Sequence, residues 1–108
     1  MLQGLYKVEF ETARRKAVGI IFASDGKLRG GSSSYAYIGF YRQNGHQVSG
    51  EVTAKPHTHD PDRPSVFGIR DVRISFHGFE KDGFASVEGT AAEAPSLGFK
   101  AFLTRLSD

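Results

Sequence analysis

The sequence predicts an all-β fold: a single domain over residues 1–108, built as an eight-stranded antiparallel up-and-down barrel with little or no helix. Three observations support this expectation. Apolar and polar residues alternate with period two along most of the chain. Asp-Gly and Asn-Gly pairs, which favour the tight turns of β-hairpins, separate several of the alternating stretches. A length of 108 residues is enough for one domain with a modest hydrophobic core.

The eight strands are expected over residues 6–11, 17–24, 27–30, 35–42, 46–55, 66–78, 84–90 and 97–106. In the first, Tyr6, Val8 and Phe10 alternate with charged residues, which is typical of a half-buried strand. The second is apolar on both faces. Asp25-Gly26 then predicts a hairpin into the short third strand, because a type I′ turn needs positive φ at both central positions.

The fourth and fifth strands form the next predicted hairpin, which turns at Asn44-Gly45. Val48 and Ala54 share one face of the fifth strand. The loop that follows, residues 56–64, contains three prolines. Because proline has no N–H group to donate to a ladder, this loop is expected to be extended and exposed.

The sixth strand shows the same alternation through Ile74 and Phe76, and residues 80–83 turn the chain into the seventh. Residues 91–94 form the one short window with helical character, and Pro95 ends it. Neighbouring strands joined by tight turns form an antiparallel meander.

Closure into a barrel is favoured by glycines within the strands, since glycine allows sharp bends. These are Gly19, Gly39, Gly50, Gly78, Gly89 and Gly98. An eight-stranded barrel has an interior that is filled by side chains or holds one small ligand. Six phenylalanines are expected to fill it: Phe10, Phe22, Phe76, Phe84, Phe99 and Phe102. A two-sheet sandwich is the alternative fold.

Composition excludes several function classes. Without cysteine, disulfide frameworks, zinc-thiolate sites and thiol nucleophiles are ruled out. A net charge of +2 is too small to favour nucleic acid or an anionic membrane. Oligonucleotide-binding barrels set basic residues beside stacking aromatics, whereas Tyr35 and Tyr37 flank Ala36. With neither a signal-peptide pattern nor an apolar run of about 18 residues, a cytoplasmic location is expected.

The fourth strand predicts a homodimer. Tyr35, Tyr37 and Tyr41 lie on one side of it, and Ile38 and Phe40 lie on the other. A monomeric barrel should have a polar outer face, so this apolar surplus indicates a covered surface. These five residues are the dimer-interface candidates. In the alternative interpretation, the tyrosines are half exposed with their hydroxyls in water.

The proline-rich loop carries the cluster that most resembles a metal site. His57 and His59 precede Asp60 and Asp62, as in the start of the metal motif of metallo-β-lactamase-like hydrolases. That motif continues with an aspartate and a histidine, where this chain has Pro61 and Asp62. The histidines are therefore expected to be solvated. We expect no metal, no cofactor and no catalytic residue, so the protein is not an enzyme.

Four stretches together resemble a known family. They are Gly-Leu-Tyr-Lys-Val-Glu-Phe at 4–10, Asp-Gly-Lys-Leu-Arg-Gly-Gly at 25–31, Tyr-Ala-Tyr-Ile-Gly at 35–39 and Pro-Ser-Val-Phe at 64–67. Their order and spacing are similar to those of the GrlR-type family, negative regulators of type III secretion in bacteria. The resemblance implies a lipocalin-like barrel that pairs into a dimer.

The resemblance also implies a regulatory protein partner. The family is described as binding a transcriptional activator, not DNA, through an acidic surface stretch. The corresponding hairpin here consists of Arg42, Gln43, Asn44, Gly45 and His46, and none of these is a carboxylate. These five are the partner-binding candidates. Because charge complementarity governs partner choice, the partner is expected to differ from the family's activator.

Three functions follow as hypotheses. The first is a non-enzymatic regulatory protein that acts by protein–protein contact. The second is a barrel that encloses a small apolar ligand. The third is a hydrolase that uses the loop from His57 to Asp62. Inward phenylalanines that fill the lumen favour the first over the second.

Overall fold

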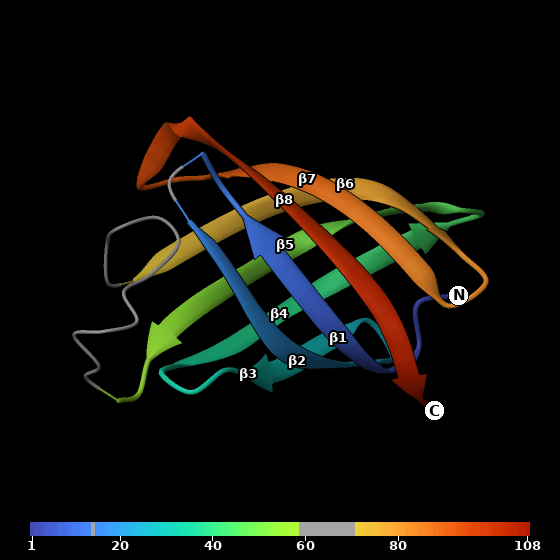
Figure 1. Cartoon of the computed structure of the whole chain (residues 1–108). Helices are drawn as coiled ribbons and strands as arrows, with labels where there is room; N and C mark the ends of the chain where they lie inside the picture. The colour runs from blue at the N-terminus through green and yellow to red at the C-terminus, as the bar shows by residue number, and fades with distance from the viewer. Residues whose placement is uncertain (14, 59–70) are drawn as a thin grey trace.

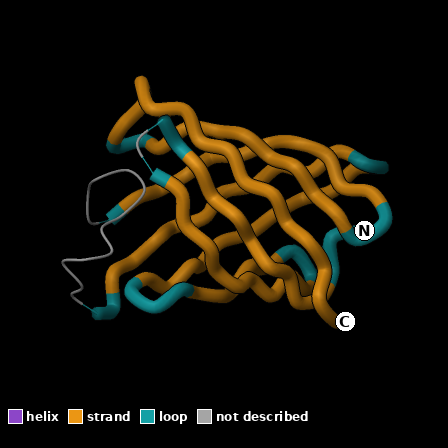
Figure 2. Tube along the Cα trace, viewed as in Figure 1, coloured by secondary structure: helices purple, strands orange, loops and turns teal. Residues whose placement is uncertain are grey.

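The computed structural model describes residues 1–13, 15–58 and 71–108 of the chain. Its eight strands are β1 (Gly4–Glu11), β2 (Lys16–Ser24), β3 (Lys27–Gly31), β4 (Tyr35–Asn44), β5 (Gln47–Pro56), β6 (Val72–Lys81), β7 (Phe84–Ala91) and β8 (Ala94–Ser107). The described residues form strands, turns and short connections and contain no helix (Figures 1 and 2). The predicted all-β class is confirmed.

The strands close into a barrel in which each pairs antiparallel with the next along the chain. The last strand completes the ring, because β8 pairs with β1 from Ser107 opposite Leu5 to Lys100 opposite Glu11. Figure 1 shows β1 and β8 crossing the front of the barrel side by side. This closure confirms the up-and-down barrel and overturns the sandwich alternative, since a sandwich would leave strand edges open.

The hairpins at Asp25-Gly26 and Asp82-Gly83 turn as the sequence indicates, and a third turns one residue later. Asp25 and Gly26 have φ values of 51° and 79°, the positive pair that a type I′ turn requires. Asn44 is still the last residue of β4, and the turn begins with Gly45 at φ 63°. Glycine at the first central position is characteristic of a type II′ turn.

The end of the chain is more regular than expected. Only Ala92 and Glu93 separate β7 from β8, so a tight hairpin turn lies in the window over 91–94 and β8 begins three residues before its expected start. The sixth strand was expected from residue 66, and β6 begins at Val72. Residues 66–70 lie outside the described part of the chain, whereas 71 is described and is not in a strand.

Inward side chains from all eight strands form one core, and half of the expected phenylalanines belong to it. Phe10, Phe76 and Phe99 are buried in the lumen. Phe22 and Phe84 are instead on the outer wall, where they are 42% and 48% exposed. Phe102 also points outward, because it alternates with the buried residues of β8. The expectation that these three rings fill the lumen is therefore wrong. The inward neighbours of these three residues include small alanines that leave room for the buried rings; examples are Ala23, Ala85 and Ala101.

Glycine is required where β4 and β5 approach each other most closely. A Cβ atom on Gly39 would overlap the carbonyl oxygen of Glu51, and one on Gly50 would overlap that of Phe40. The two strands therefore pack backbone to backbone at these positions, which supports the tight coiling of a small barrel.

Candidate functional site

The lumen is almost completely filled. Phe10 lies at its centre, with its ring centroid 5.1 Å from that of Tyr37 and 5.8 Å from that of Phe99. The cavity that remains among the described residues has a volume of about 30 Å³ and an entirely apolar lining, which includes Leu2, Ile21 and Leu103. That is room for about one water molecule, whereas small-molecule sites usually measure roughly 300 Å³ or more.

The first residues of the chain close one end of the lumen. Leu2 is 2% exposed and lines the cavity. Its N–H donates to Oε1 of Gln43 at 2.6 Å, and its carbonyl accepts from the Tyr41 hydroxyl at 2.5 Å. The α-amino group of Met1 lies 3.0 Å from a carboxylate oxygen of Glu80. Figure 1 shows the N-terminus beside the β6–β7 turn at this end of the barrel.

Glu80 is the charged centre of this closure and is only 3% exposed. Its carboxylate accepts hydrogen bonds from Nε2 of Gln43 at 2.8 Å and from the N–H of Gly83 at 3.4 Å. Burial alone would raise the pKa of Glu80, but these hydrogen bonds and the Met1 ammonium outweigh it and hold the pKa below its ordinary value. The carboxylate is therefore kept charged inside an apolar barrel.

Sequence reasoning missed Glu80, which it placed in a turn. A signal was present, because the inward positions of β6 run Val72, Ile74, Phe76, Gly78 and Glu80. A carboxylate in phase with an apolar series is expected to face a buried cation or several donors.

The hairpin over 42–46, predicted to bind a partner, is divided by this network. Gln43 turns its side chain toward Glu80 and Leu2, and Nδ1 of His46 lies 3.0 Å from the carbonyl oxygen of Glu80. Arg42, Asn44, Gly45 and His46 are exposed. Gln43 thus anchors the hairpin from the inside, and the four exposed residues form its accessible tip, with the His46 ring also contacting the Glu80 carbonyl.

The five dimer-interface candidates also divide. Tyr37 and Tyr41 are buried in the core at 8% and 6% exposure, and Tyr35 packs against the core. Burial raises the pKa of both the Tyr37 and Tyr41 hydroxyls. Ile38 and Phe40 point outward, at 41% and 47% exposure. The buried tyrosines cannot line an outer surface, so Ile38 and Phe40 are the members of this set that a second protein could contact.

Outward side chains of three adjacent strands surround Ile38 and Phe40 and form two rows across the wall. One row is Lys27, Phe40 and Glu51, and the other is Arg29, Ile38 and Thr53. We call these six residues the β4 face. Lys27 and Arg29 come from β3, and Glu51 and Thr53 from β5.

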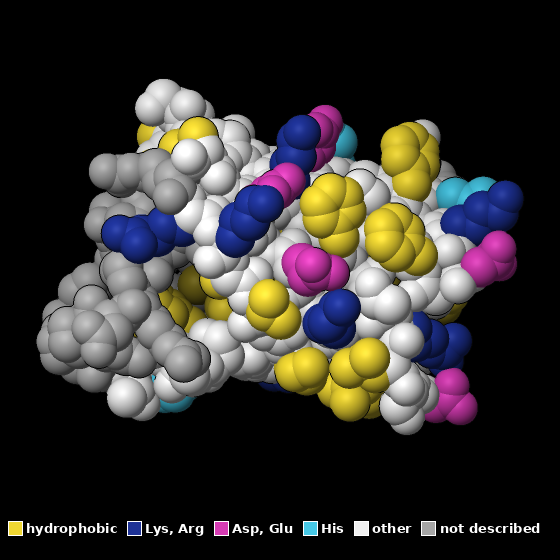
Figure 3. Space-filling view, in the orientation of Figure 1, with side chains coloured by type: hydrophobic (Ala, Val, Ile, Leu, Met, Phe, Trp, Pro, Cys, Tyr) yellow, Lys and Arg dark blue, Asp and Glu magenta, His cyan; other side chains and the backbone are white. Residues whose placement is uncertain are grey.

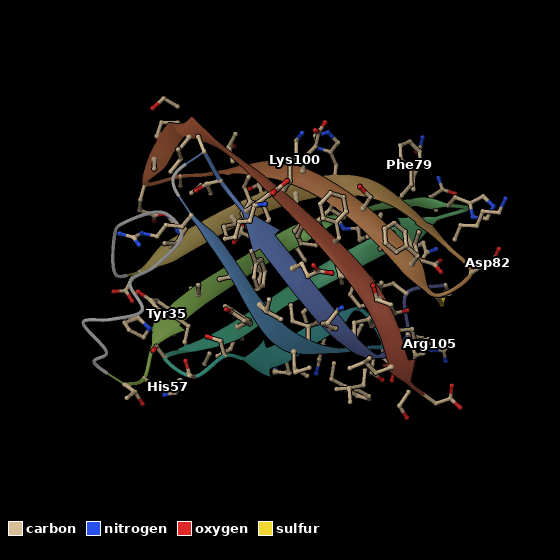
Figure 4. All side chains as sticks on the ribbon, in the orientation of Figure 1. Tyr35, His57, Phe79, Asp82, Lys100 and Arg105 are labelled. Atoms are coloured by element: carbon tan, nitrogen blue, oxygen red, sulfur yellow. The ribbon has the colours of Figure 1, made fainter. Side chains whose placement is uncertain are left out.

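A second apolar group lies on another part of the wall. Phe79 of β6, Phe84 of β7 and Phe102 of β8 form what we call the phenylalanine cluster. The rings of Phe84 and Phe102 stack with their centroids 6.4 Å apart, and Phe79 is 62% exposed at the outer surface (Figure 4). Figure 3 shows apolar side chains gathered over this part of the barrel, with charged side chains around them.

The suggested metal cluster is only partly described. Nδ1 of His57 lies 2.7 Å from the Thr58 hydroxyl, and Nε2 lies 3.2 Å from the carbonyl oxygen of Ser32. His59, Asp60 and Asp62 lie outside the described residues. Within the described ranges, no three His, Asp or Glu side chains are grouped to hold a metal ion.

Comparison with known proteins gives no relative. No protein-family model matches the chain, and no curated protein matches it.

None of the described segments is a helix of the length and apolar character needed to cross a bilayer.

Proposed function

We propose that this chain is a non-enzymatic regulatory protein that works in the cytoplasm as a homodimer and acts by protein–protein contact. One contrast carries the proposal: the lumen is filled, while large apolar side chains stand on the outer wall. Phe40, Phe79 and Phe84 are each between 47% and 62% exposed. Exposed apolar groups of this kind are characteristic of surfaces that bind other proteins.

The small lumen favours this function over enclosure of an apolar ligand. A cavity of about 30 Å³ is roughly a tenth of the volume that a small-molecule site needs. Titration with a fluorescent polyene fatty acid tests the alternative. We expect no saturable binding; a single saturable site with one probe per barrel would favour the ligand-binding function instead.

The resemblance to GrlR-type regulators suggests the class of partner. On that basis the partner is a regulatory protein such as a transcriptional activator, and the regulated process is type III secretion. The exposed hairpin tip contributes Arg42 and no carboxylate, so the partner surface that contacts it is expected to be acidic.

A deletion experiment in the bacterium that encodes the chain tests this proposal. Deletion should raise the transcripts of the secretion genes, and a plasmid copy should restore repression. The purified protein should not shift promoter DNA. Unchanged transcripts would refute the secretion role, and a specific DNA shift would refute action through protein contact.

The hairpin is tested in the same assay. Arg42→Glu should weaken repression because it reverses the charge of the tip that meets an acidic partner. Lys55→Glu is a matched control, since Lys55 is exposed at the opposite end of β5 and receives the same charge change. Equal repression by wild type and Arg42→Glu would remove the hairpin from the contact surface.

A further inference from the structure

Two oppositely charged side chains flank Phe40 without pairing with each other. Phe40 lies directly opposite Lys27 on one side and directly opposite Glu51 on the other. The two flanking residues are two strand spacings apart, roughly 9–10 Å between Cα atoms. In the described part of the chain, neither Lys27 nor Glu51 has an ion-pair partner.

The outer wall of a barrel is convex, so a second barrel touches it most easily along one strand and its two neighbours. On the β4 face that strand carries Ile38 and Phe40, both more than two-fifths exposed. Cations lie on one side of it, Lys27 and Arg29 on β3, and an anion lies on the other, Glu51 on β5. The face is therefore apolar along β4, positively charged on the β3 side and negatively charged on the β5 side.

Such a face is complementary to a copy of itself. Consider a twofold axis that runs parallel to β4, in the plane between the two barrels. It places each residue at the same height along the strand in both subunits, and it sets β3 of one subunit over β5 of the other. Phe40 and Ile38 then meet their own copies along β4. Lys27 comes to lie over Glu51 of the partner subunit, and the same pair forms a second time by symmetry.

We propose that the homodimer forms through the β4 face, around a twofold axis along β4, with two reciprocal ion pairs between Lys27 and the partner's Glu51. This inference deepens the proposed function and rests on its homodimer. It names a second copy of this chain as the occupant of the face.

Charge favours this axis over a twofold axis that runs across the strands. An axis across the strands would place β3 over β3 of the second copy. The Lys27 of one chain would then face a cation, Arg29 of the partner subunit, and like charges opposed in an interface are unfavourable. The axis along β4 replaces this repulsion with attraction on both flanks.

The phenylalanine cluster lacks the same arrangement. Phe84 lies between Lys81 of β6 and Thr104 of β8, so a cation stands on one flank and no anion on the other. A twofold axis along β7 would therefore form no ion pair there. This leaves the cluster accessible for a different protein.

Charge exchange tests the proposal, with the dimer dissociation constant measured by sedimentation equilibrium. Lys27→Glu and Glu51→Lys should each weaken the dimer at least tenfold, because each places like charges together twice. The double variant Lys27→Glu/Glu51→Lys should return to within about threefold of wild type, since the exchanged pairs attract again. Circular dichroism verifies that each variant is folded.

Two further variants separate the possible failures. Ser86→Glu inserts a charge between Phe79 and Phe102 and should leave the dimer unchanged, whereas Phe40→Ser should weaken it. A monomeric wild type at high micromolar concentration would refute the homodimer itself. If wild type is a dimer, three results would overturn only the proposed face and axis. These are a dimer that both single charge variants leave intact, a double variant whose dimer is as weak as those of the single variants, and a dimer that Ser86→Glu disrupts.

Discussion

Glu80 is the residue that ties the N-terminus to the β4–β5 hairpin and the β6–β7 turn. Its buried carboxylate receives the Met1 ammonium, the amide of Gln43 and the N–H of Gly83. Gln43 in turn holds the backbone of Leu2, whose side chain closes the lumen. One carboxylate thus positions both the N-terminal residues that cover the end of the lumen and the base of the exposed hairpin.

Replacement of Glu80 by Gln should lower the free energy of unfolding by about 1–3 kcal/mol, because charge-assisted hydrogen bonds are lost in a buried site. Urea denaturation at neutral pH measures this. Glu88→Gln is the control, since Glu88 is 64% exposed and lies 3.6 Å from His77 at the surface; its effect should stay within about 0.5 kcal/mol. Equal effects for the two variants would show that the Glu80 network adds no stability.

The same group should make stability depend on pH. The pKa of Glu80 is lower in the folded protein than the ordinary value of 4.5, so the unfolded chain binds the proton more tightly. Its stabilising contribution is therefore complete above the unfolded pKa and is lost as the pH falls through the folded pKa. Denaturation measured from pH 6 to pH 2 should show a shallower acid loss for Glu80→Gln than for wild type; parallel curves would contradict this assignment.

At the scale of elements, the β4–β5 hairpin is a closely packed part of the wall. Gly39 and Gly50 let the two backbones approach until no Cβ would fit between them. This close pairing sets Phe40 directly between Lys27 and Glu51. The proposed dimer surface therefore depends on glycines that point away from it.

Gly50→Ala should destabilise the barrel by about 2–3 kcal/mol, because the added methyl group overlaps the backbone of β4 and the strands must separate. Gly98→Ala is the matched control, since nothing lies within 4 Å of a Cβ at that position of β8. We expect it to change stability by less than about 0.5 kcal/mol. Thermal unfolding compares the two, and similar midpoints would refute the close approach of β4 and β5.

At the scale of the whole molecule, the described residues form a barrel whose lumen is packed with side chains and whose outer wall carries large apolar side chains. Side chains from every strand and Leu2 fill the lumen. Other large apolar side chains stand on the outer wall, in the phenylalanine cluster, on the β4 face and along β2 at Val18, Ile20 and Phe22. The proposed function depends on this contrast between a filled lumen and large apolar side chains on the outer wall.

Phe99→Ala should lower stability by about 3–5 kcal/mol, because it leaves an apolar cavity in a packed lumen. Benzene should then raise the melting temperature of the variant, as a dry apolar cavity binds such molecules, and leave that of wild type unchanged. Phe99→Leu, which opens a smaller cavity, tests the trend if Phe99→Ala does not fold. A benzene effect on wild type would show that the lumen has room for a ligand.

The sequence by itself determined the class of fold and the order of its strands. Alternation and the Asp25-Gly26 turn are local features, because neighbouring residues fix both side-chain direction and backbone conformation. The hairpin at 42–46 could be located for the same reason. The functions of its residues could not, since Gln43 turns inward only because Glu80 meets it from another strand.

Only the tertiary structure decided which apolar residues enter the lumen. β2 is apolar on both faces, so alternation could not choose between Ile21 and Phe22. The finite width of the closed barrel made the choice, because Phe10, Tyr37 and Phe99 already fill its centre. Closure likewise brought Met1 to Glu80, and such a contact between distant parts of a chain exists only once the sheet has wrapped around on itself.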